Sequence, residues 1–155
     1  MGIRGRQTDG GRGRCMPELI GSLDSRRRPL MRVQVEGKDD LLSIIDTAFT
    51  GELLVDEDIA QSWGVVVLDV NAQIELGDGS RCEVQQGLLT VVWFGRNHDA
   101  TVQVVRRATG QSQHRPRRDG EPVALLGTEL IAPGSLNVNF TSGVVTIEEL
   151  APGQV

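Results

Sequence analysis

The chain has no tyrosine and few other aromatic residues, with three Phe and two Trp among 155 residues. Valine and leucine are abundant, and 19 residues are glycine. Abundant β-branched residues and turn-forming glycine favour many short strands over a helical bundle. At this length we expect one domain, large enough to bury a core without disulfide or metal support.

Cysteine is also scarce, with only Cys15 and Cys82, which lie far apart. Their spacing matches neither a zinc site nor a redox motif, so we expect free thiols in a reducing compartment and no cofactor. No apolar stretch is long enough to span a membrane, and the N-terminus lacks the apolar segment of a signal peptide. The sequence therefore predicts a cytoplasmic protein that does not bind membranes.

Charge is unevenly distributed. The net charge is −5, yet residues 1–30 contain seven Arg and only three acidic residues. The acidic remainder argues against nucleic acid as the main partner, although the Arg-Gly pairs of the tail could bind RNA weakly. Low hydrophobicity and high charge instead favour a disordered, dispensable tail over 1–30. The domain is expected over 31–150, followed by a short tail over 151–155.

Hydrophobic alternation begins near Met31 and predicts a succession of short strands and turns. Strands are expected over 31–35, 41–46, 53–55, 65–76, 82–94, 101–105, 123–126, 136–140 and 145–147. Asp56 should cap a short helix over 57–63, and Thr128 a second one. Residues 107–121 should form a surface loop. This pattern is typical of an all-β fold, a small closed barrel with one or two short helices.

The most informative motif is Asp46-Thr47-Ala48, which directly follows the apolar strand. A carboxylate placed after four apolar side chains is costly unless it is paired or hydrogen-bonded, which indicates a specific role. The alternative is an ordinary turn in which Asp46 accepts backbone hydrogen bonds. Residues 125–127, Leu-Leu-Gly, show the same order as residues 44–46. An apolar strand ends at a residue of a different kind, Gly127 or Asp46, and a short helical element follows.

The ordered pattern resembles the retropepsin-like family of single-lobed aspartic proteases. It is most similar to bacterial and archaeal members whose motif is Asp-Thr-Gly/Ala-Phe-x-Gly-x-Leu; residues 46–53 are Asp-Thr-Ala-Phe-Thr-Gly-Glu-Leu. The family's second motif, two apolar residues, Gly, two variable residues and Leu, corresponds to residues 125–130. Between them the family has a β-hairpin flap, whose tip would fall at Gly77-Asp78-Gly79. The resemblance covers residues 31–150 and implies an acid-protease barrel.

The resemblance implies an aspartic endopeptidase that works as a homodimer, because the chain carries only one such Asp motif. Asp46 and its symmetry mate would flank one water and share one proton. Thr47 would hydrogen-bond across the dimer axis, and Gly127 would pack closely under the Asp loop. The last hairpin, over 136–147, is expected to contribute interface strands.

The other implied roles concern the peptide substrate. Backbone at Ala48 and Thr50 would bond to an extended peptide, Ala124 and Leu125 would line side-chain pockets, and the flap would close over the substrate. Ala48 departs from the commoner Gly, and its methyl group could restrict the backbone or crowd the substrate.

Two other classes of function remain open. One is a catalytically silent member of the same fold that binds peptides or mediates dimerisation, and the other is an unrelated β-barrel binding module. A Ser-His-Asp triad through His98 is disfavoured because there is no Gly-x-Ser-x-Gly motif, and His98 is expected in an exposed loop. His98 with Asp99 is too sparse for a structural metal site.

Overall fold

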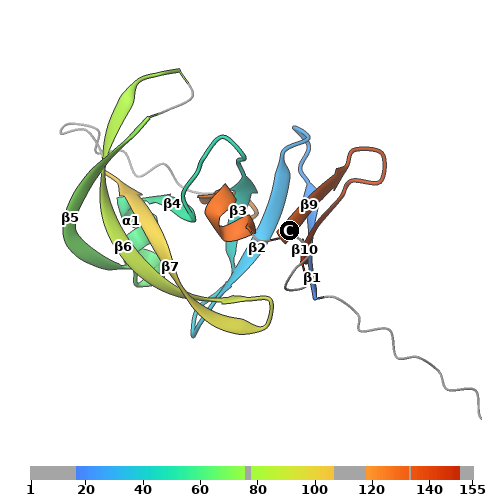
Figure 1. Cartoon of the computed structure of the whole chain (residues 1–155), viewed down its shortest axis with the longest axis horizontal. Coiled ribbons are helices and arrows are strands. Elements are labelled where there is room, and N and C mark those ends of the chain that lie inside the picture. Colours follow the sequence, from blue (N-terminus) through green and yellow to red (C-terminus); the bar gives the residue numbers. More distant parts are fainter. Residues whose placement is uncertain (1–16, 76–77, 107–117, 133, 151–155) are drawn as a thin grey trace, which may run out of the picture.

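The computed structural model describes residues 17–75, 78–106, 118–132 and 134–150, which form ten strands and two short helices (Figure 1). In chain order these elements are β1 (Glu18–Leu23), β2 (Pro29–Val35), β3 (Leu41–Ile45), β4 (Leu53–Asp56), α1 (Glu57–Trp63), β5 (Val66–Glu75), β6 (Arg81–Trp93), β7 (Arg96–Val105), β8 (Ala124–Leu126), α2 (Thr128–Ile131), β9 (Gly134–Asn139) and β10 (Val144–Glu149).

Six strands close into a barrel, in the order β6-β7-β4-β8-β3-β2, with β2 returning to β6. The closing contact pairs Gln34 with Val92 and Val35 with Val91. Most neighbouring strands are antiparallel, but β3 is parallel to β8 and β4 is parallel to β7. The expected all-β class, with a small closed barrel and two short helices, is confirmed.

Alternation along each strand fills the barrel with aliphatic side chains. In β3, Leu41, Ser43 and Ile45 are buried, whereas Leu42 and Ile44 are only half-buried. Full burial of one aliphatic side chain stabilises a fold by about 1.5–3 kcal/mol, so this inward row anchors the strand. The same alternation leaves the outward row of β3 available for other contacts.

The two helices begin in different ways. Oδ1 of Asp56 accepts a hydrogen bond from the amide of Ile59 at 2.8 Å, as the sequence predicts, and Gly64 ends α1 with a φ of 71°. The prediction that Thr128 caps α2 is wrong. Gly127 is the N-cap and provides no side-chain bond, because the tight approach of another loop requires glycine there.

Strand β1 lies inside the segment expected to be disordered, and that expectation is wrong for residues 18–30. β1 is antiparallel to β10, from the pair Glu18–Glu148 to the pair Ser22–Val144, and it also meets β2. Its Leu19 and Leu23 side chains pack against the core. The ordered domain therefore begins before the expected boundary at residue 31.

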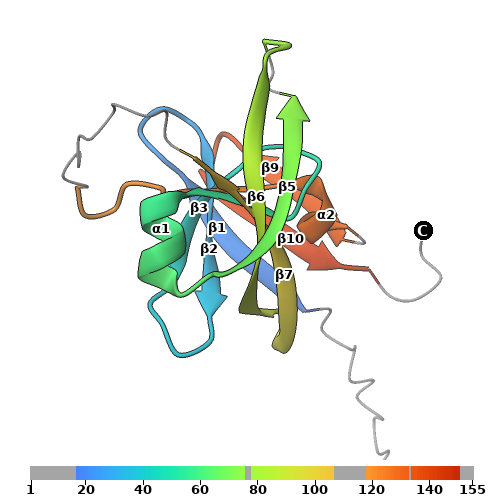
Figure 2. The same ribbon diagram turned by 90° about the vertical axis from the view of Figure 1, so that its left-hand side faces the viewer.

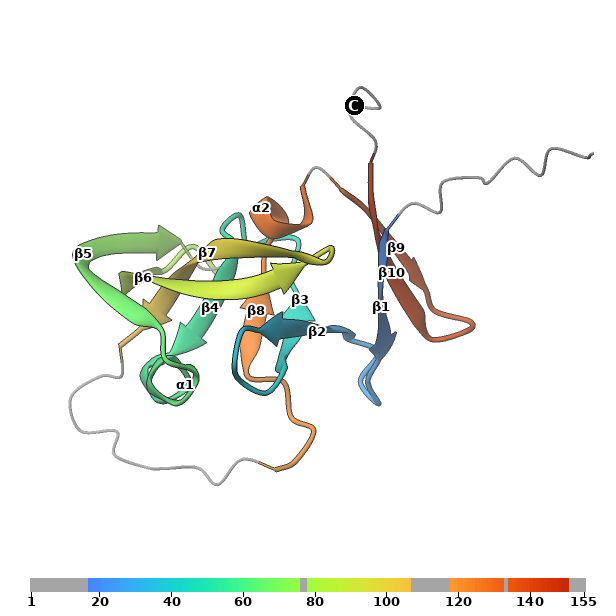
Figure 3. The same ribbon diagram turned by 90° about the horizontal axis from the view of Figure 1, so that it is seen from below.

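The last hairpin, β9–β10, continues the sheet beyond β1 and lies beside the barrel (Figure 3). Because β10 is paired with β1 on one side and β9 on the other, β9 is the edge strand at this end of the sheet. The expectation that this hairpin contributes strands to a dimer interface stays a prediction, because the structure describes a single chain.

Several expected segments lie outside the described residues, namely 1–16, 107–117 and 151–155, which hold the far tail, most of the surface loop and the C-terminal tail. Neither helix in the described part of the chain has the length and apolar character needed to cross a membrane.

Candidate active site

Asp46 occupies the first position after β3, and its backbone ties the strand to β8. Its amide donates to the carbonyl oxygen of Leu126 at 3.0 Å. Its carboxylate Oδ1 accepts a hydrogen bond from the amide of Ala48 at 2.9 Å, and its carbonyl oxygen accepts one from Phe49 at 3.1 Å. One carboxylate oxygen therefore orients the turn while the half-buried side chain stays accessible to solvent.

The parallel pairing of β3 and β8 brings the two sequence motifs together. Ile44 lies opposite Leu125 and Ile45 opposite Leu126, so the next residues, Asp46 and Gly127, leave the sheet side by side. Two motifs about eighty positions apart in the sequence thus form one structural unit at the carboxyl ends of these strands.

Gly127 lies directly against the loop that follows Asp46. A Cβ atom on Gly127 would lie 2.0 Å from the carbonyl oxygen of Gly51 and 2.7 Å from that of Phe49. The amides of Gly127 and Thr128 donate to the carbonyl oxygens of Glu52 and Phe49, each at 2.9 Å. The close packing expected at this glycine is present, and backbone hydrogen bonds fasten the loop to the start of α2.

Thr47, Ala48 and Thr50 are exposed at the surface of this loop. Within the described residues the Thr47 hydroxyl makes no hydrogen bond, which leaves it available to another chain. Ala48 is not among the described residues with positive φ. Its methyl group therefore imposes no left-handed backbone strain, so the departure from Gly carries no conformational cost in this loop.

The hairpin β5–β6 projects beyond the rest of the molecule (Figure 2). At its tip, Oδ1 of Asp78 accepts hydrogen bonds from the hydroxyl and amide of Ser80, at 2.5 and 2.9 Å. These bonds hold the pKa of Asp78 below its ordinary value. Gly79 has a φ of 81°, which only glycine adopts freely. The third expected tip residue, Gly77, lies outside the described residues.

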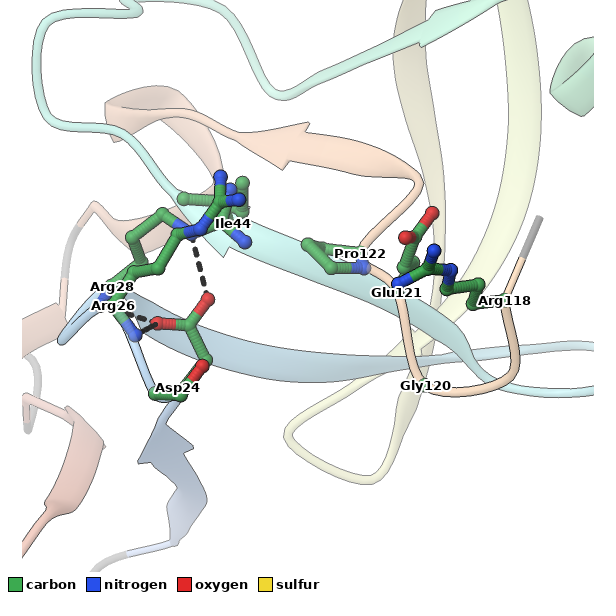
Figure 4. Close-up of a pocket in the computed structure, with 9 residues that line it drawn as sticks. Asp24, Arg26, Arg28, Ile44, Arg118, Gly120, Glu121 and Pro122 are labelled. Carbon is green, nitrogen blue, oxygen red and sulfur yellow. Dashed lines mark hydrogen bonds and ion pairs between the residues drawn. The ribbon is translucent and has the colours of Figure 1, made fainter. Parts of the chain in front are cut away.

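Two hollows adjoin the outer face of β3 and β8. The smaller, of about 220 Å³, is lined by Ile44, Leu54 and Leu125. Ala124 also borders it, although this residue is largely buried in the barrel core. The larger hollow, of about 630 Å³, shares Ile44 and is lined mainly by charged residues (Figure 4).

Ile44 is the last outward-facing residue of β3, and Asp46 follows two positions later, just past the end of the strand. Because Ile44 borders both hollows, an apolar surface and a charged one meet on the strand that ends next to this carboxylate. Such a surface can accommodate an extended chain whose successive side chains differ in character.

Glu52 also belongs to this site, although it occupies a variable position of the motif and the motif gives it no role. Its Oε1 accepts a hydrogen bond from the amide of Thr101 at 3.0 Å, and its Oε2 lies 2.5 Å from Nε2 of His98. The pair fastens the end of the Asp loop to β7. His98 is exposed, as expected, but it lies in strand β7 and not in a loop. No local sequence signal connects residues so far apart.

The described residues contain no group of three or more His, Cys, Asp or Glu placed to hold a metal ion. No protein-family model matches the chain, and a search of curated proteins finds no match. Function is therefore inferred from the motifs and from the geometry in which they meet.

Proposed function

We propose that this protein is a homodimeric aspartic endopeptidase of the retropepsin-like type. The observation that carries the proposal is the seating of the Asp46 loop on Gly127, where two parallel strands end together. A loop fixed by backbone hydrogen bonds on both sides holds a carboxylate in one orientation. Such preorganisation is what acid-base catalysis requires of its groups.

Hydrolysis would use Asp46 from each of two chains. One carboxylate takes a proton from a water, whose oxygen attacks the peptide carbonyl carbon, while the protonated partner donates to the carbonyl oxygen. The C–N bond then breaks, and the leaving nitrogen receives a proton from the dyad. Two carboxyl groups so close together cannot both ionise readily, so they hold one proton between them.

The exposure of Thr47 supports a second chain at this site. An exposed threonine directly beside the carboxylate, with a hydroxyl that forms no hydrogen bond among the described residues, is suited to contact across a twofold axis. Ala48 and Thr50 lie along the same exposed loop, where backbone groups can bond to an extended peptide. The projecting β5–β6 hairpin would close over that peptide and exclude water.

The test is cleavage of a random peptide library by the wild type and by Asp46→Asn, from acid to neutral pH. The amide keeps the shape of the side chain but cannot act as a base, so Asp46→Asn should lose cleavage and remain folded. Asp40→Asn, at an exposed carboxylate away from the loop, is the matched control and should retain full activity. Wild-type activity should pass through an optimum within this pH range, because catalysis needs one carboxylate and one carboxylic acid.

If Asp46→Asn cleaves as fast as the wild type, the mechanism is wrong. If neither protein cleaves any peptide but both bind peptides or dimerise, the chain is a silent member of the fold.

A further inference from the structure

The larger hollow next to β3 is formed by two segments that are distant in sequence. The turn between β1 and β2 forms one wall, and the residues that lead into β8 form the other, with Ile44 between them (Figure 4). Its volume of about 630 Å³ is ample for one amino-acid side chain. We call it the arginine hollow, after the lining residues Arg26, Arg28 and Arg118.

The ionisable side chains that line the arginine hollow sum to +1 (three arginines and two carboxylates), even though the chain as a whole has a net charge of −5. Three arginines line it, against the carboxylates of Asp24 and Glu121. A guanidinium group has a planar fork of donors that matches a carboxylate, which makes arginine the usual choice for binding acidic groups.

One of the two acids is already engaged within the turn. Asp24 accepts hydrogen bonds from the amides of Arg26 and Arg28, both at 2.9 Å, and from Nε of Arg28 at 2.7 Å. Arg28 thus uses its Nε for the turn, while its terminal nitrogens retain further donors. Asp24 holds the arginines of the turn in place and has little capacity left to attract a ligand of opposite charge.

The arginine hollow lies within reach of the candidate catalytic carboxylate. Ile44 borders it and precedes Asp46, the first residue after β3, by two positions, a separation of about 7 Å at the usual rise of a strand. An extended peptide advances by about 3.3–3.6 Å per residue. A substrate side chain close to the cleaved bond can therefore enter the hollow, while a neighbouring one meets the apolar hollow at Leu125.

We infer that the arginine hollow binds an aspartate or glutamate side chain of the peptide substrate and so sets the specificity of cleavage. The inference rests on the proposed peptidase function. It names a substrate class, acidic peptides with an aliphatic residue nearby, that the catalytic motif alone does not select.

The test compares kcat/KM for peptide sets that differ only by Glu, Gln or Lys at each position around the cleaved bond. The wild type should prefer Glu over Gln at one position by about tenfold, as expected for a charge-assisted hydrogen bond. Added salt should reduce this preference. The double variant Arg26→Glu with Arg118→Glu should reverse it, so that the Lys peptide becomes the better substrate.

Arg32→Glu makes the same change of charge at an exposed position of β2 that does not line the hollow, and it should keep the preference for Glu. Thermal melting of each variant shows that it is folded. Cleavage without an acidic preference, or a preference unchanged in the double variant, overturns this inference and leaves the peptidase proposal intact. Absence of cleavage by the wild type overturns both.

Discussion

Gly127 is the residue where one added carbon should do the most damage. We predict that Gly127→Ala destabilises the protein by about 1–3 kcal/mol, because its Cβ would collide with the backbone of the Asp loop. Peptide cleavage should fall as well, since the loop that orients Asp46 must move. Urea unfolding and a cleavage assay measure the two effects.

Gly37→Ala is the control for this substitution. Gly37 has a φ of 70° and nothing within 4 Å of an added Cβ, so only backbone strain of about 1 kcal/mol is expected. Equal losses in the two variants would show that the contact beneath the loop is not tight.

The carboxylate of Asp24 gives a pH-dependent prediction. The amide of Arg28 above all, together with the Arg28 side chain and the amide of Arg26, lowers the pKa of Asp24 below its ordinary value of 3.8. Its contribution to stability is therefore complete above that value and is lost as the pH falls through the lowered pKa. Asp24→Asn should be less stable than the wild type at neutral pH, and the difference should vanish in strong acid. Urea unfolding of both proteins across this range measures it; a constant difference would argue against the ion pair.

Site residues that belong to a local motif could be predicted from the sequence. Site residues that come together only when the chain folds could not. Asp46 and Gly127 each follow an apolar run, and that pattern is visible in the chain itself. Glu52 and His98 become neighbours only because β4 is parallel to β7. The arginine hollow likewise joins the β1–β2 turn to residues about ninety positions later, a proximity that no local pattern encodes.

Among the elements, the N-terminal strand provides the clearest test. Deletion of residues 1–30 should destabilise the protein strongly, because it removes β1, exposes the edge of β10 and takes away Leu19 and Leu23. Each side chain contributes at most about 1.5–3 kcal/mol, since both are only partly buried. Deletion of residues 1–16, which stops short of β1, should leave the thermal transition unchanged. Coincident melting curves for the two deletions would show that β1 is dispensable.

Elements with strong local signals agree with the sequence. The strand before Asp46 and helix α1 with its Asp56 cap occupy the expected positions. The sequence does not predict strand β1, because its alternating Leu19, Gly21 and Leu23 lie in an arginine-rich segment, and the charge of the whole segment outweighs the pattern. Pairing with the distant β10 supplies the stabilisation that its own composition lacks.

At the scale of the whole molecule, the proposed function requires two chains. Mixing wild type with Asp46→Asn should lower activity below that of the wild-type chains alone, because mixed dimers would contain only one competent carboxylate. Equal amounts should halve the activity per wild-type chain after exchange. Sedimentation velocity on the same samples should show dimers throughout. If the activity per wild-type chain does not change on mixing, or if a monomer is fully active, the active site is not shared between two chains.

The pairing of β1 with β10 also has a consequence for biosynthesis. Glu18 pairs with Glu148, so a strand translated early has no hydrogen-bonding partner on this side until nearly all of the described domain has left the ribosome. Contacts between such distant residues slow folding, and an unpaired strand edge is open to association with other nascent chains meanwhile. The polar and charged residues that flank β1 in the sequence would then protect the nascent chain, because they disfavour aggregation of β1 before β10 is available for pairing.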